Sequence, residues 1–272
     1  PSLSDGIRRL EAEIGVRLFH RLGRSVELTD AGRAFVGPAR RLTRDREAVF
    51  ESVATVRDLH GGTLDIVALP TLAADPHGRL VGGLRKAHPG IAVRIAAPED
   101  DGAVVAMVLD GRSELGLTEL RTHHNKSGDK LGDELVAVSL ERQELVAVCP
   151  PRTRLATSGR LPVARLRGMP LVTTPPGTST RDLLDRALAS AGVDPVIAVE
   201  TSQREAIAPL VLSGAGTSFL PARLAESLAA QGAVVARLVP TLTRTIGLVH
   251  RPAPLTPAAR AFVELARPKR RS

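Results

Sequence analysis

The sequence predicts a mixed α/β protein in three parts: a short helical unit, one long helix, and two α/β lobes that enclose a cleft. Three observations support this prediction. Residues 1–28 combine a short amphipathic helical pattern with a basic turn, residues 29–60 carry a seven-residue apolar repeat, and strand and helix patterns alternate from residue 61 onward. With 272 residues, the chain is long enough to form about two domains with substantial cores.

Residues 3–18 carry one apolar helical stripe, and a hairpin pattern follows. The apolar side chains are spaced by four, three, four and four residues, at Leu3, Ile7, Leu10, Ile14 and Leu18. Residues 20–28 then alternate as a short hairpin with Gly23 at its tip. A compact helix followed by an arginine-bearing hairpin is typical of the second half of a winged helix-turn-helix that reads DNA. We expect Ser2 or Ser4 to cap the helix at the end that meets phosphates and base edges.

The next segment, residues 30–60, is predicted to form a single long helix that bends near Pro38 and ends at Gly61-Gly62. One side of it carries a heptad seam, formed by Phe35, Ala39, Leu42, Arg46, Val49, Val53 and Val56. A seam of this length has to be buried, and we expect it to pair with a second copy of the chain, which makes the protein a homodimer or a larger homo-oligomer. The alternative is that the helix packs on its own domain.

Beyond residue 62, strand and helix patterns alternate in two successive sets. The expected strands are residues 64–69, 91–95, 115–117, 145–148, 171–173, 197–199 and 217–220. The expected helices are residues 78–87, 103–109, 181–191, 203–213, 222–230 and 257–266, the last with Thr256 as its N-cap. Two such sets predict two open-sheet lobes with a cleft between them. Lobe I is expected to comprise residues 61–149 and 240–272, and lobe II residues 150–239.

The charge distribution indicates a polyanionic partner. The formal net charge is +8, and residues 8–46 hold ten arginines against five acidic residues. Residues 260–272 hold five lysines and arginines against one glutamate. The alternative is that these charges only keep the chain in solution. With five phenylalanines, no tryptophan and no tyrosine, stacking on single-stranded nucleic acid is not expected, whereas duplex DNA fits contacts from arginine to phosphate.

Composition and motifs also exclude several classes of function. The sequence has no apolar run long enough to cross a bilayer and no signal-peptide pattern, so we expect a soluble cytoplasmic protein without a membrane partner. The one cysteine, Cys149, fits a small buried side chain in a reducing compartment. No Gly-x-Ser-x-Gly, His-Glu-x-x-His or Cys-x-x-Cys motif occurs, and the seven histidines are scattered. We therefore expect no catalytic residues, no metal site and no cofactor.

Strand ends in both lobes offer candidate contacts for a ligand, because ligands of open α/β sheets lie where strands end and helix N-termini point into the cleft. The candidates are Thr71 and Leu72 after the first strand, Gly177, Thr178 and Arg181 where a helix of lobe II begins, and Thr201 and Ser202 after another strand. Helix N–H groups next to Arg181 predict a small anionic ligand. We expect Ser179 and Asp182 to form a capping box there. The alternative is that this segment is a well-capped helix and nothing more.

Taken together, these motifs resemble the LysR-type transcriptional regulators. The matching segments are PSLS at 1–4, IRRLE at 7–11, GVRLFHR at 15–21, LTDAG at 28–32, ETSQ at 200–203, GAG at 214–216 and FLP at 219–221. The resemblance extends over the whole chain, and its N-terminal motif is the more specific part. It implies a winged helix-turn-helix, a linker helix that pairs two subunits, and a periplasmic-binding-protein-like effector domain, commonly in a tetramer.

The resemblance also implies roles for individual residues. By match to the motif, the contacts to DNA would come from Pro1, Ser2 and Ser4 at the start of the recognition helix, from Arg24 in the wing, and from Arg8 and Arg21. The effector cleft would be lined by Thr71, Leu72, Thr178 and Thr201. The function that follows is a ligand-responsive regulator whose partners are double-stranded DNA, a small-molecule effector and further copies of the chain.

Two departures from the family's pattern bear on DNA binding. Asp5-Gly6 stands where members often have a basic or polar pair, and a carboxylate near phosphates lowers affinity. The family also has further residues ahead of the position of Pro1, which form its first helix and its positioning helix. Without them residues 1–28 would lose several kcal/mol of apolar burial, at roughly 25 cal/mol per Å², so we expect these residues not to form a competent DNA-binding domain by themselves.

The alternative functions are a two-lobe solute-binding protein and a chain that only pairs with other subunits.

Overall fold

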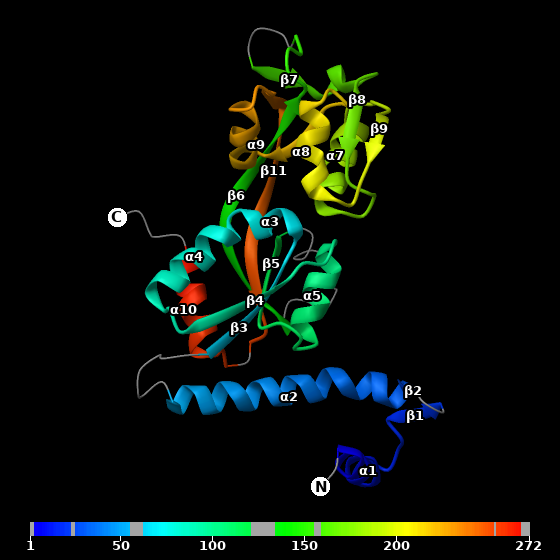
Figure 1. Ribbon diagram of the computed structural model, residues 1–272, viewed down its shortest axis with the longest axis vertical. Helices are drawn as coiled ribbons and strands as arrows, with labels where there is room; N and C mark the ends of the chain where they lie inside the picture. The colour runs from blue at the N-terminus through cyan, green and yellow to red at the C-terminus, as the bar shows by residue number, and fades with distance from the viewer. Residues whose placement is uncertain are drawn as a thin grey trace.

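The computed structural model describes residues 3–22, 25–54, 62–120, 134–154, 159–252 and 254–267. Figure 1 shows two α/β lobes stacked along the long axis of the molecule, with a long helix lying across the far end of lobe I. A short helix and a hairpin lie at the N-terminal end of that long helix. This arrangement confirms the predicted mixed α/β fold class. None of the described helices combines the length and apolar character that crossing a membrane requires.

The N-terminal unit consists of α1 (Leu3–Ile14), β1 (Phe19–Leu22) and β2 (Ser25–Leu28), the two strands being antiparallel. Polar contacts hold this unit together and join it to the helix that follows. Glu11 accepts a hydrogen bond from the backbone N–H of Leu18 at 2.7 Å. The Thr29 hydroxyl donates to the carbonyl of Arg17 at 2.7 Å and accepts from the N–H of Gly32 at 2.9 Å, which caps the next helix. The chain therefore folds here in the predicted order of helix, hairpin and helix.

The long helix α2 (Asp30–Ala54) contacts lobe I through polar side chains. Arg41 and Arg44 donate hydrogen bonds to backbone carbonyls of lobe I. Arg44 also pairs with Asp65 at 3.1 Å, and both side chains are largely buried. One face of α2 is thereby held on the lobe that follows it in the chain.

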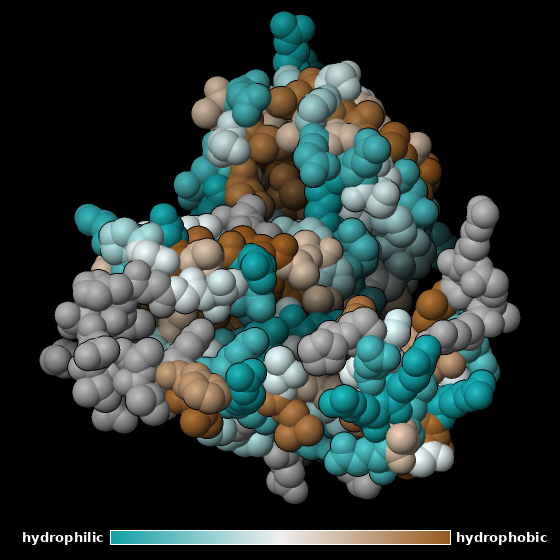
Figure 2. All heavy atoms as spheres, turned by 60° about the horizontal axis from the view of Figure 1, so that its bottom comes forward, coloured by the Kyte–Doolittle hydropathy of each residue, from teal (hydrophilic) through white to brown (hydrophobic). Residues whose placement is uncertain are grey.

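The opposite face of α2 is open. Leu42 is 72% exposed, and Val49 and Phe50 are exposed as well. The guanidinium carbon of Arg46 lies 5.0 Å from the centre of the Phe50 ring. Figure 2 shows apolar residues scattered over the side of the molecule that α2 and the N-terminal unit form. Leu42 and Val49 belong to the predicted heptad seam, which therefore does not pack on its own lobe at these positions; residues 55–60 of the predicted helix lie outside the described residues.

Lobe I contains β3 (Gly62–Ala68), β4 (Ile91–Ala96), β5 (Leu115–Glu119), α3 (Pro70–Ala74), α4 (His77–Ala87), α5 (Asp101–Leu109) and α10 (Pro257–Ala266). The strands are parallel, with β3 pairing with both β4 and β5. Helices α4 and α10 lie on one side of the lobe and α5 on the other (Figure 1). The core includes Ile66 of β3 and Phe262 of α10, both fully buried. The one-turn helix α3 was not predicted, and it places Thr71 and Leu72 in a helix instead of an open loop.

Lobe II contains β7 (Arg160–Pro162), β8 (Pro170–Thr173), β9 (Val196–Glu200), β10 (Ser218–Pro221), the 3-10 turn η3 (Val163–Leu166), α7 (Ser179–Ser190), α8 (Arg204–Leu212) and α9 (Ala222–Ala229). β8 and β9 form a parallel pair. One apolar core lies around Leu184 and Phe219, and a second around Val172 and Val211. The helices that enclose these cores supply most of the wall of the pocket described below.

Two long antiparallel strands, β6 (Val136–Cys149) and β11 (Val234–His250), run through both lobes (Figure 1). They join the lobes in one sheet with the order β10-β6-β11-β5-β3-β4. The sequence predicted residues 145–148 of β6 and missed β11 altogether. Pro240 interrupts β11 and the polar run at residues 141–144 interrupts β6, so neither strand shows an unbroken strand pattern, although Leu242, Ile246 and Leu248 of β11 do lie at alternating positions.

The crossing strands contribute side chains to the cores of both lobes. Leu145 and Cys149 of β6 lie in the lobe II core, whereas Ile246 of β11 lies in the lobe I core. The lobe II core also includes Leu242. The two cores therefore meet inside β11, between Leu242 and Ile246, because a continuous strand carries its pairing from one lobe into the next.

Candidate functional site

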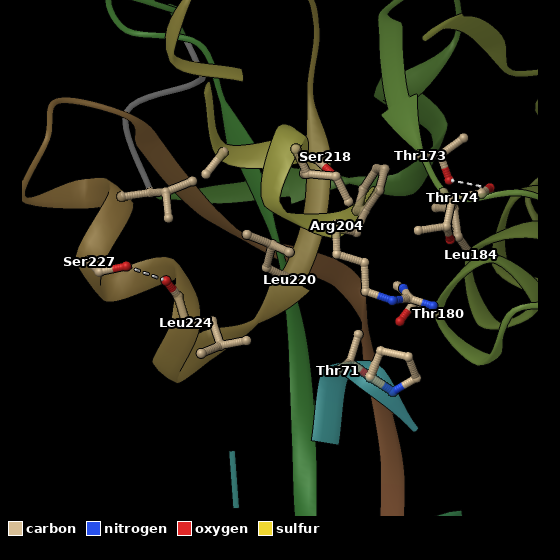
Figure 3. Close-up of a pocket in the computed structure, with 15 residues that line it drawn as sticks. Thr71, Thr173, Thr174, Thr180, Leu184, Arg204, Ser218, Leu220, Leu224 and Ser227 are labelled. Carbon is tan, nitrogen blue, oxygen red and sulfur yellow. Dashed lines mark hydrogen bonds between the residues drawn. The ribbon is translucent and has the colours of Figure 1, made fainter. Parts of the chain in front are cut away.

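A cavity of about 270 Å³ lies where the two lobes meet, mostly within lobe II. Lobe I contributes Pro70 and Thr71 at the start of α3. Lobe II contributes the ends of β8 and β10 and one face each of α7, α8 and α9. Figure 3 shows Thr71, Thr180 and Arg204 close together on one side of this pocket, while Leu220 and Leu224 lie on another. The cavity thus has a polar side facing lobe I and an apolar side within lobe II.

The polar side contains two buried atoms without hydrogen-bond partners among the described residues. Arg204, the first residue of α8, pairs with Glu99 of lobe I through one terminal nitrogen, but its Nε atom has no partner. The hydroxyl of Thr180, in the first turn of α7, likewise has none. Leaving a buried polar atom unpaired costs about 1–3 kcal/mol. Both atoms could therefore donate a hydrogen bond to a molecule inside the cavity.

Next to the pocket, Arg244 of β11 is buried at the junction of the lobes, with 3% of its surface exposed. Its guanidinium donates to Gln143 Oε1 at 2.6 and 2.9 Å, to the Thr71 hydroxyl at 3.1 Å and to the Ser179 hydroxyl at 3.2 Å. Burial lowers the pKa of Arg244 to about 10, against the opposing effect of the nearby carboxylates Glu119 and Asp101. The side chain is therefore still charged at neutral pH.

Ser179 and Glu119 extend this network across the junction. The Ser179 hydroxyl, at the N-terminus of α7 in lobe II, donates at 2.8 Å to Glu119 Oε2 at the end of β5 in lobe I. Gln143 of β6 donates in turn to the carbonyl of Asp75 at 3.4 Å. The lobes are thus joined by a buried chain of hydrogen bonds that begins at Thr71, a residue of the pocket wall.

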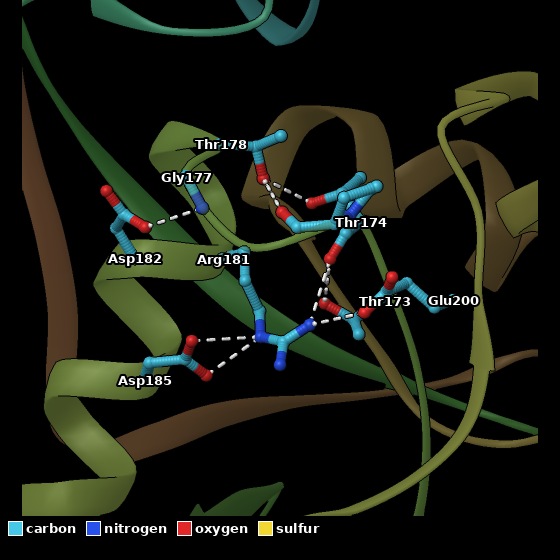
Figure 4. Close-up of polar contacts among 9 residues, drawn as sticks. Thr173, Thr174, Gly177, Thr178, Arg181, Asp182, Asp185 and Glu200 are labelled. Carbon is cyan, nitrogen blue, oxygen red and sulfur yellow. Dashed lines mark hydrogen bonds and ion pairs between the residues drawn. The ribbon is translucent and has the colours of Figure 1, made fainter.

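The segment predicted to hold an anion makes its polar contacts internally. Figure 4 shows Arg181 between two carboxylates, Asp185 at 2.9 Å and Glu200 at 3.2 Å, and its side chain is 11% exposed. The N–H of Gly177 donates to Asp182 at 3.2 Å, and Thr178 donates to the carbonyl of residue 175. The charge of Arg181 is therefore compensated by its own lobe.

The expected capping box is wrong. The N-cap of α7 is Thr178, one residue ahead of Ser179, and its side chain makes no capping hydrogen bond. Asp182 accepts from Gly177 instead of from Ser179. The Ser179 hydroxyl is engaged with Glu119 and Arg244, which are long-range partners that the local pattern does not contain.

Of the seven predicted effector contacts, Thr71 alone lines the pocket. Leu72 is fully buried in the lobe I core. Thr178 is buried, and the hydroxyl of Thr201 accepts from the N–H of residue 203. Ser202 is exposed, and Gly177 adopts a positive φ of 85° in the turn before α7. The structure therefore brings Thr71 to the cavity and leaves the other six in neighbouring elements.

The sequence analysis missed Thr180, Arg204, Gln143 and Arg244. Two of them had a local signal, since Thr180 directly follows Ser179, the expected capping residue of a helix, and Arg204 lies directly after the ETSQ segment at the start of another helix. Gln143 and Arg244 were missed because they lie on stretches of strand that were not predicted. The described residues contain no group of three histidine, cysteine, aspartate or glutamate side chains able to hold a metal ion.

The predicted DNA contacts are described only in part. Pro1, Ser2 and Arg24 lie outside the described residues, as does the side chain of Arg21. Ser4 is exposed in the first turn of α1. Arg8 is exposed on the same helix and pairs with Asp5 at 3.5 Å, so the carboxylate that departs from the family's pattern also engages a candidate cation.

Comparisons with known proteins point to the same family for the N-terminal segment and for the two lobes. The sequence pattern of the LysR substrate binding domain matches residues 57–271, and that of the bacterial regulatory helix-turn-helix protein, lysR family, matches residues 1–33. The HTH-type transcriptional regulator ShiR of Corynebacterium glutamicum (strain R) is 33% identical over 227 residues, which cover 80% of this chain and 72% of that protein.

Solved structures show the same fold. Full-length OxyR of Pseudomonas aeruginosa superposes with a TM-score of 0.75 at 21% identity, covering 97% of this chain and 83% of that one. The effector binding domain of QuiR, in complex with shikimate, superposes with a TM-score of 0.62 at 20% identity. That match covers 76% of this chain and 95% of QuiR's.

Proposed function

The chain belongs to the LysR family of DNA-binding transcriptional regulators, and we propose that it acts in the cytoplasm and senses a small effector in the pocket between its lobes. The observation that carries this proposal is the pair of buried polar atoms in the pocket, Thr180 Oγ1 and Arg204 Nε, which have no partner in the described part of the chain. Another nitrogen of the same Arg204 side chain pairs with Glu99, and this ion pair joins the two lobes.

The effector we propose is a small anion. Arg204 offers it an unpaired N–H inside the cavity, whereas Arg181 is compensated by two carboxylates. An anionic group there would form charge-assisted hydrogen bonds, which are stronger than neutral ones. QuiR, solved with shikimate in its effector binding domain, supports a small molecule as the kind of effector for this fold.

The effector would act by changing how the lobes are held together. Thr71 touches both the cavity and Arg244, and Arg204 touches both the cavity and Glu99. A ligand that bonds to these residues favours the arrangement of the lobes in which it contacts both. Lobe I in turn contacts α2 through Arg44 and Asp65, and α2 leads to the N-terminal unit. The signal would travel along this row of contacts to the DNA.

Subunit pairing would use the open face of α2, where Leu42, Val49 and Phe50 are exposed. Pairing two such faces places two N-terminal units side by side, as recognition of two half-sites on DNA requires. A tetramer would be two of these dimers. Within one chain, α1 buries no side chain among the described residues, and Ile7 and Leu10 line an open groove of about 730 Å³. The N-terminal unit of a single chain is therefore expected to bind DNA weakly.

A solute-binding protein with the same two lobes is not favoured, because the lysR-family helix-turn-helix pattern matches residues 1–33 and α2 connects that segment to the lobes. A chain that pairs with other subunits without binding DNA itself would also use α2. Binding to duplex DNA separates both alternatives from the regulator.

Fluorescence anisotropy with a labelled duplex from the region upstream of its gene tests the proposal, at about 50 and about 200 mM salt. We expect binding that weakens steeply with salt, and a weaker complex for Arg8→Ala on α1. The matched control is Arg165→Ala, which removes the same charge from an exposed position of η3 in lobe II. Equal losses in the two variants would contradict the assigned DNA face, and no binding at either salt concentration would favour the pairing-only chain.

A further inference from the structure

The apolar part of the pocket is a chamber inside lobe II. Its walls are Leu184 of α7, Ile207 and Ala208 of α8, Phe219 and Leu220 of β10, and Leu224 of α9. In Figure 3, Leu220 and Leu224 lie on the side of the cavity away from Thr71 of lobe I. This chamber is separate from the strand-end loops on which the sequence placed the ligand, and its chemistry differs from theirs.

The polar atoms of the cavity gather at the opposite side. The guanidinium of Arg204 points toward Thr180 and Thr71 in Figure 3. Arg204 Nε and Thr180 Oγ1 are both donors and both lack a partner within the described residues. Glu99 is bonded to another nitrogen of the same guanidinium and so fixes the plane in which Nε points. One group with two acceptor oxygens satisfies both donors.

We propose that the effector is an amphipathic carboxylic acid, whose carboxylate accepts hydrogen bonds from Arg204 and Thr180 and whose apolar body fills the chamber between α8 and α9. This inference rests on the proposed function and specifies the ligand of the same pocket. The cavity of about 270 Å³ lies just below the range of roughly 300–1,000 Å³ usual for ligand pockets, so the acid is small.

Two other classes of ligand fit this cavity less well. A neutral apolar molecule would fill the chamber but leave Arg204 Nε and Thr180 Oγ1 unpaired. A polyhydroxylated acid would satisfy those two donors, but its hydroxyls would face Ile207, Phe219 and Leu224, where burial of an unpaired hydroxyl is unfavourable. The combination of one carboxylate and one apolar body satisfies both sides.

Isothermal titration calorimetry of the full chain with butyrate, hexanoate, benzoate and shikimate tests the ligand class. Each additional buried methylene is expected to tighten binding about fourfold, so hexanoate would bind roughly 15-fold tighter than butyrate. Benzoate is expected to bind at least tenfold tighter than shikimate. Affinities that do not depend on chain length, tighter binding of shikimate than of benzoate, or no binding by any of the four acids would overturn the proposal.

Substitutions locate the two ends of the ligand. Ala208→Leu fills the chamber and is expected to remove the gain from butyrate to hexanoate, while the control Ala189→Leu, at an exposed position of α7, leaves it intact. Thr180→Val keeps the shape of the side chain, removes the unpaired hydroxyl, and is expected to weaken all three apolar acids about equally. Thermal melts by circular dichroism check that each variant folds. An unchanged chain-length series in Ala208→Leu would place the apolar body elsewhere and refute the assignment.

Anisotropy of the DNA complex in the presence of the same acids separates this inference from the proposed function. Binding that follows chain length without any effect on DNA affinity leaves the ligand class standing and refutes the regulatory role of the pocket. A DNA response to shikimate but not to hexanoate or benzoate supports the regulator and refutes the amphipathic ligand.

Discussion

Replacing Arg244 by methionine is expected to lower the free energy of unfolding of the two lobes by about 3 kcal/mol. The methionine side chain resembles the aliphatic stem of arginine, so the change removes the charge and the donors while leaving most of the packing. The hydrogen bonds lost are those to Gln143, Ser179 and Thr71.

The magnitude follows from what each partner loses. Gln143 Oε1 accepts twice from Arg244 and is left buried without these donors, at a cost of about 1–3 kcal/mol. Glu119 loses the attraction of a nearby buried cation, at a cost below the roughly 3–5 kcal/mol of breaking a direct buried ion pair, because Ser179 lies between the two side chains. Ser179 keeps its bond to Glu119 and adds little. Desolvation of Arg244, which lowers its pKa to about 10, offsets part of these losses and brings the total to about 3 kcal/mol.

A double-mutant cycle measured by urea unfolding checks this reasoning. Arg244→Met and Gln143→Leu together should cost about 1–2 kcal/mol less than the sum of the single variants, because the double variant leaves no unpaired side-chain oxygen at position 143. Arg142→Met is the control, since Arg142 is exposed and its guanidinium donates to the Thr243 hydroxyl at the surface; it should cost under about 0.5 kcal/mol. Strict additivity, or an Arg244→Met variant as stable as the wild type, would refute the network.

Three further predictions concern other parts of the chain. Gly32→Ala places a Cβ 2.1 Å from the carbonyl oxygen of Leu18, so it should destabilise the N-terminal unit by about 2 kcal/mol or more in thermal melts; an unchanged melt would contradict this. Burial lowers the pKa of His77 from 6.5 to about 4, so the unfolded chain binds the proton first and stability should fall by roughly 2–3 kcal/mol as pH drops from about 6.5 to about 4. His77→Leu should flatten that dependence in urea titrations at each pH, and a retained slope would assign it to other groups. Phe50→Glu should weaken self-association at least tenfold by sedimentation, whereas Val239→Glu, an exposed site on β11, should not; equal effects would remove α2 from the subunit interface.

Local chemistry explains the elements that the sequence predicted well. The bounds predicted for α10 match the structure, and its N-cap Thr256 accepts from the N–H of Ala259 at 3.2 Å. A capping hydroxyl, a proline in the first turn and an apolar stripe all lie within ten residues, so no distant contact is needed to recognise that helix. Apolar spacing likewise predicts α1, but the predicted stripe ran on to Leu18, whereas the helix ends at Ile14, ahead of Gly15 with its positive φ of 78°.

The candidate site depended on contacts that sequence spacing does not reveal. Arg244 contacts residues that lie 65 to 173 positions away in the chain, on strands and helices of both lobes. Arg181 shows the converse error. The sequence already showed Asp185 four residues after Arg181, a spacing at which helical ion pairs form, so an uncompensated Arg181 was not to be expected. The second partner, Glu200, is distant in sequence and comes close to Arg181 through the pairing of β8 with β9.

Because the pocket and the contacts between the lobes share residues, the structure also limits how strongly an effector can act. A ligand shifts the balance between two arrangements only by the difference between its affinities for them. Pro70 and Thr71 are the pocket residues that come from lobe I, so few contacts distinguish an arrangement with the lobes together from one with the lobes moved apart. We therefore expect a coupling energy within the usual range of about 1–3 kcal/mol, which changes DNA affinity by roughly 5–150-fold. A larger change in DNA affinity requires that two subunits joined through α2 change their lobe arrangement together. The coupling energies of the two effector pockets then add in one DNA complex.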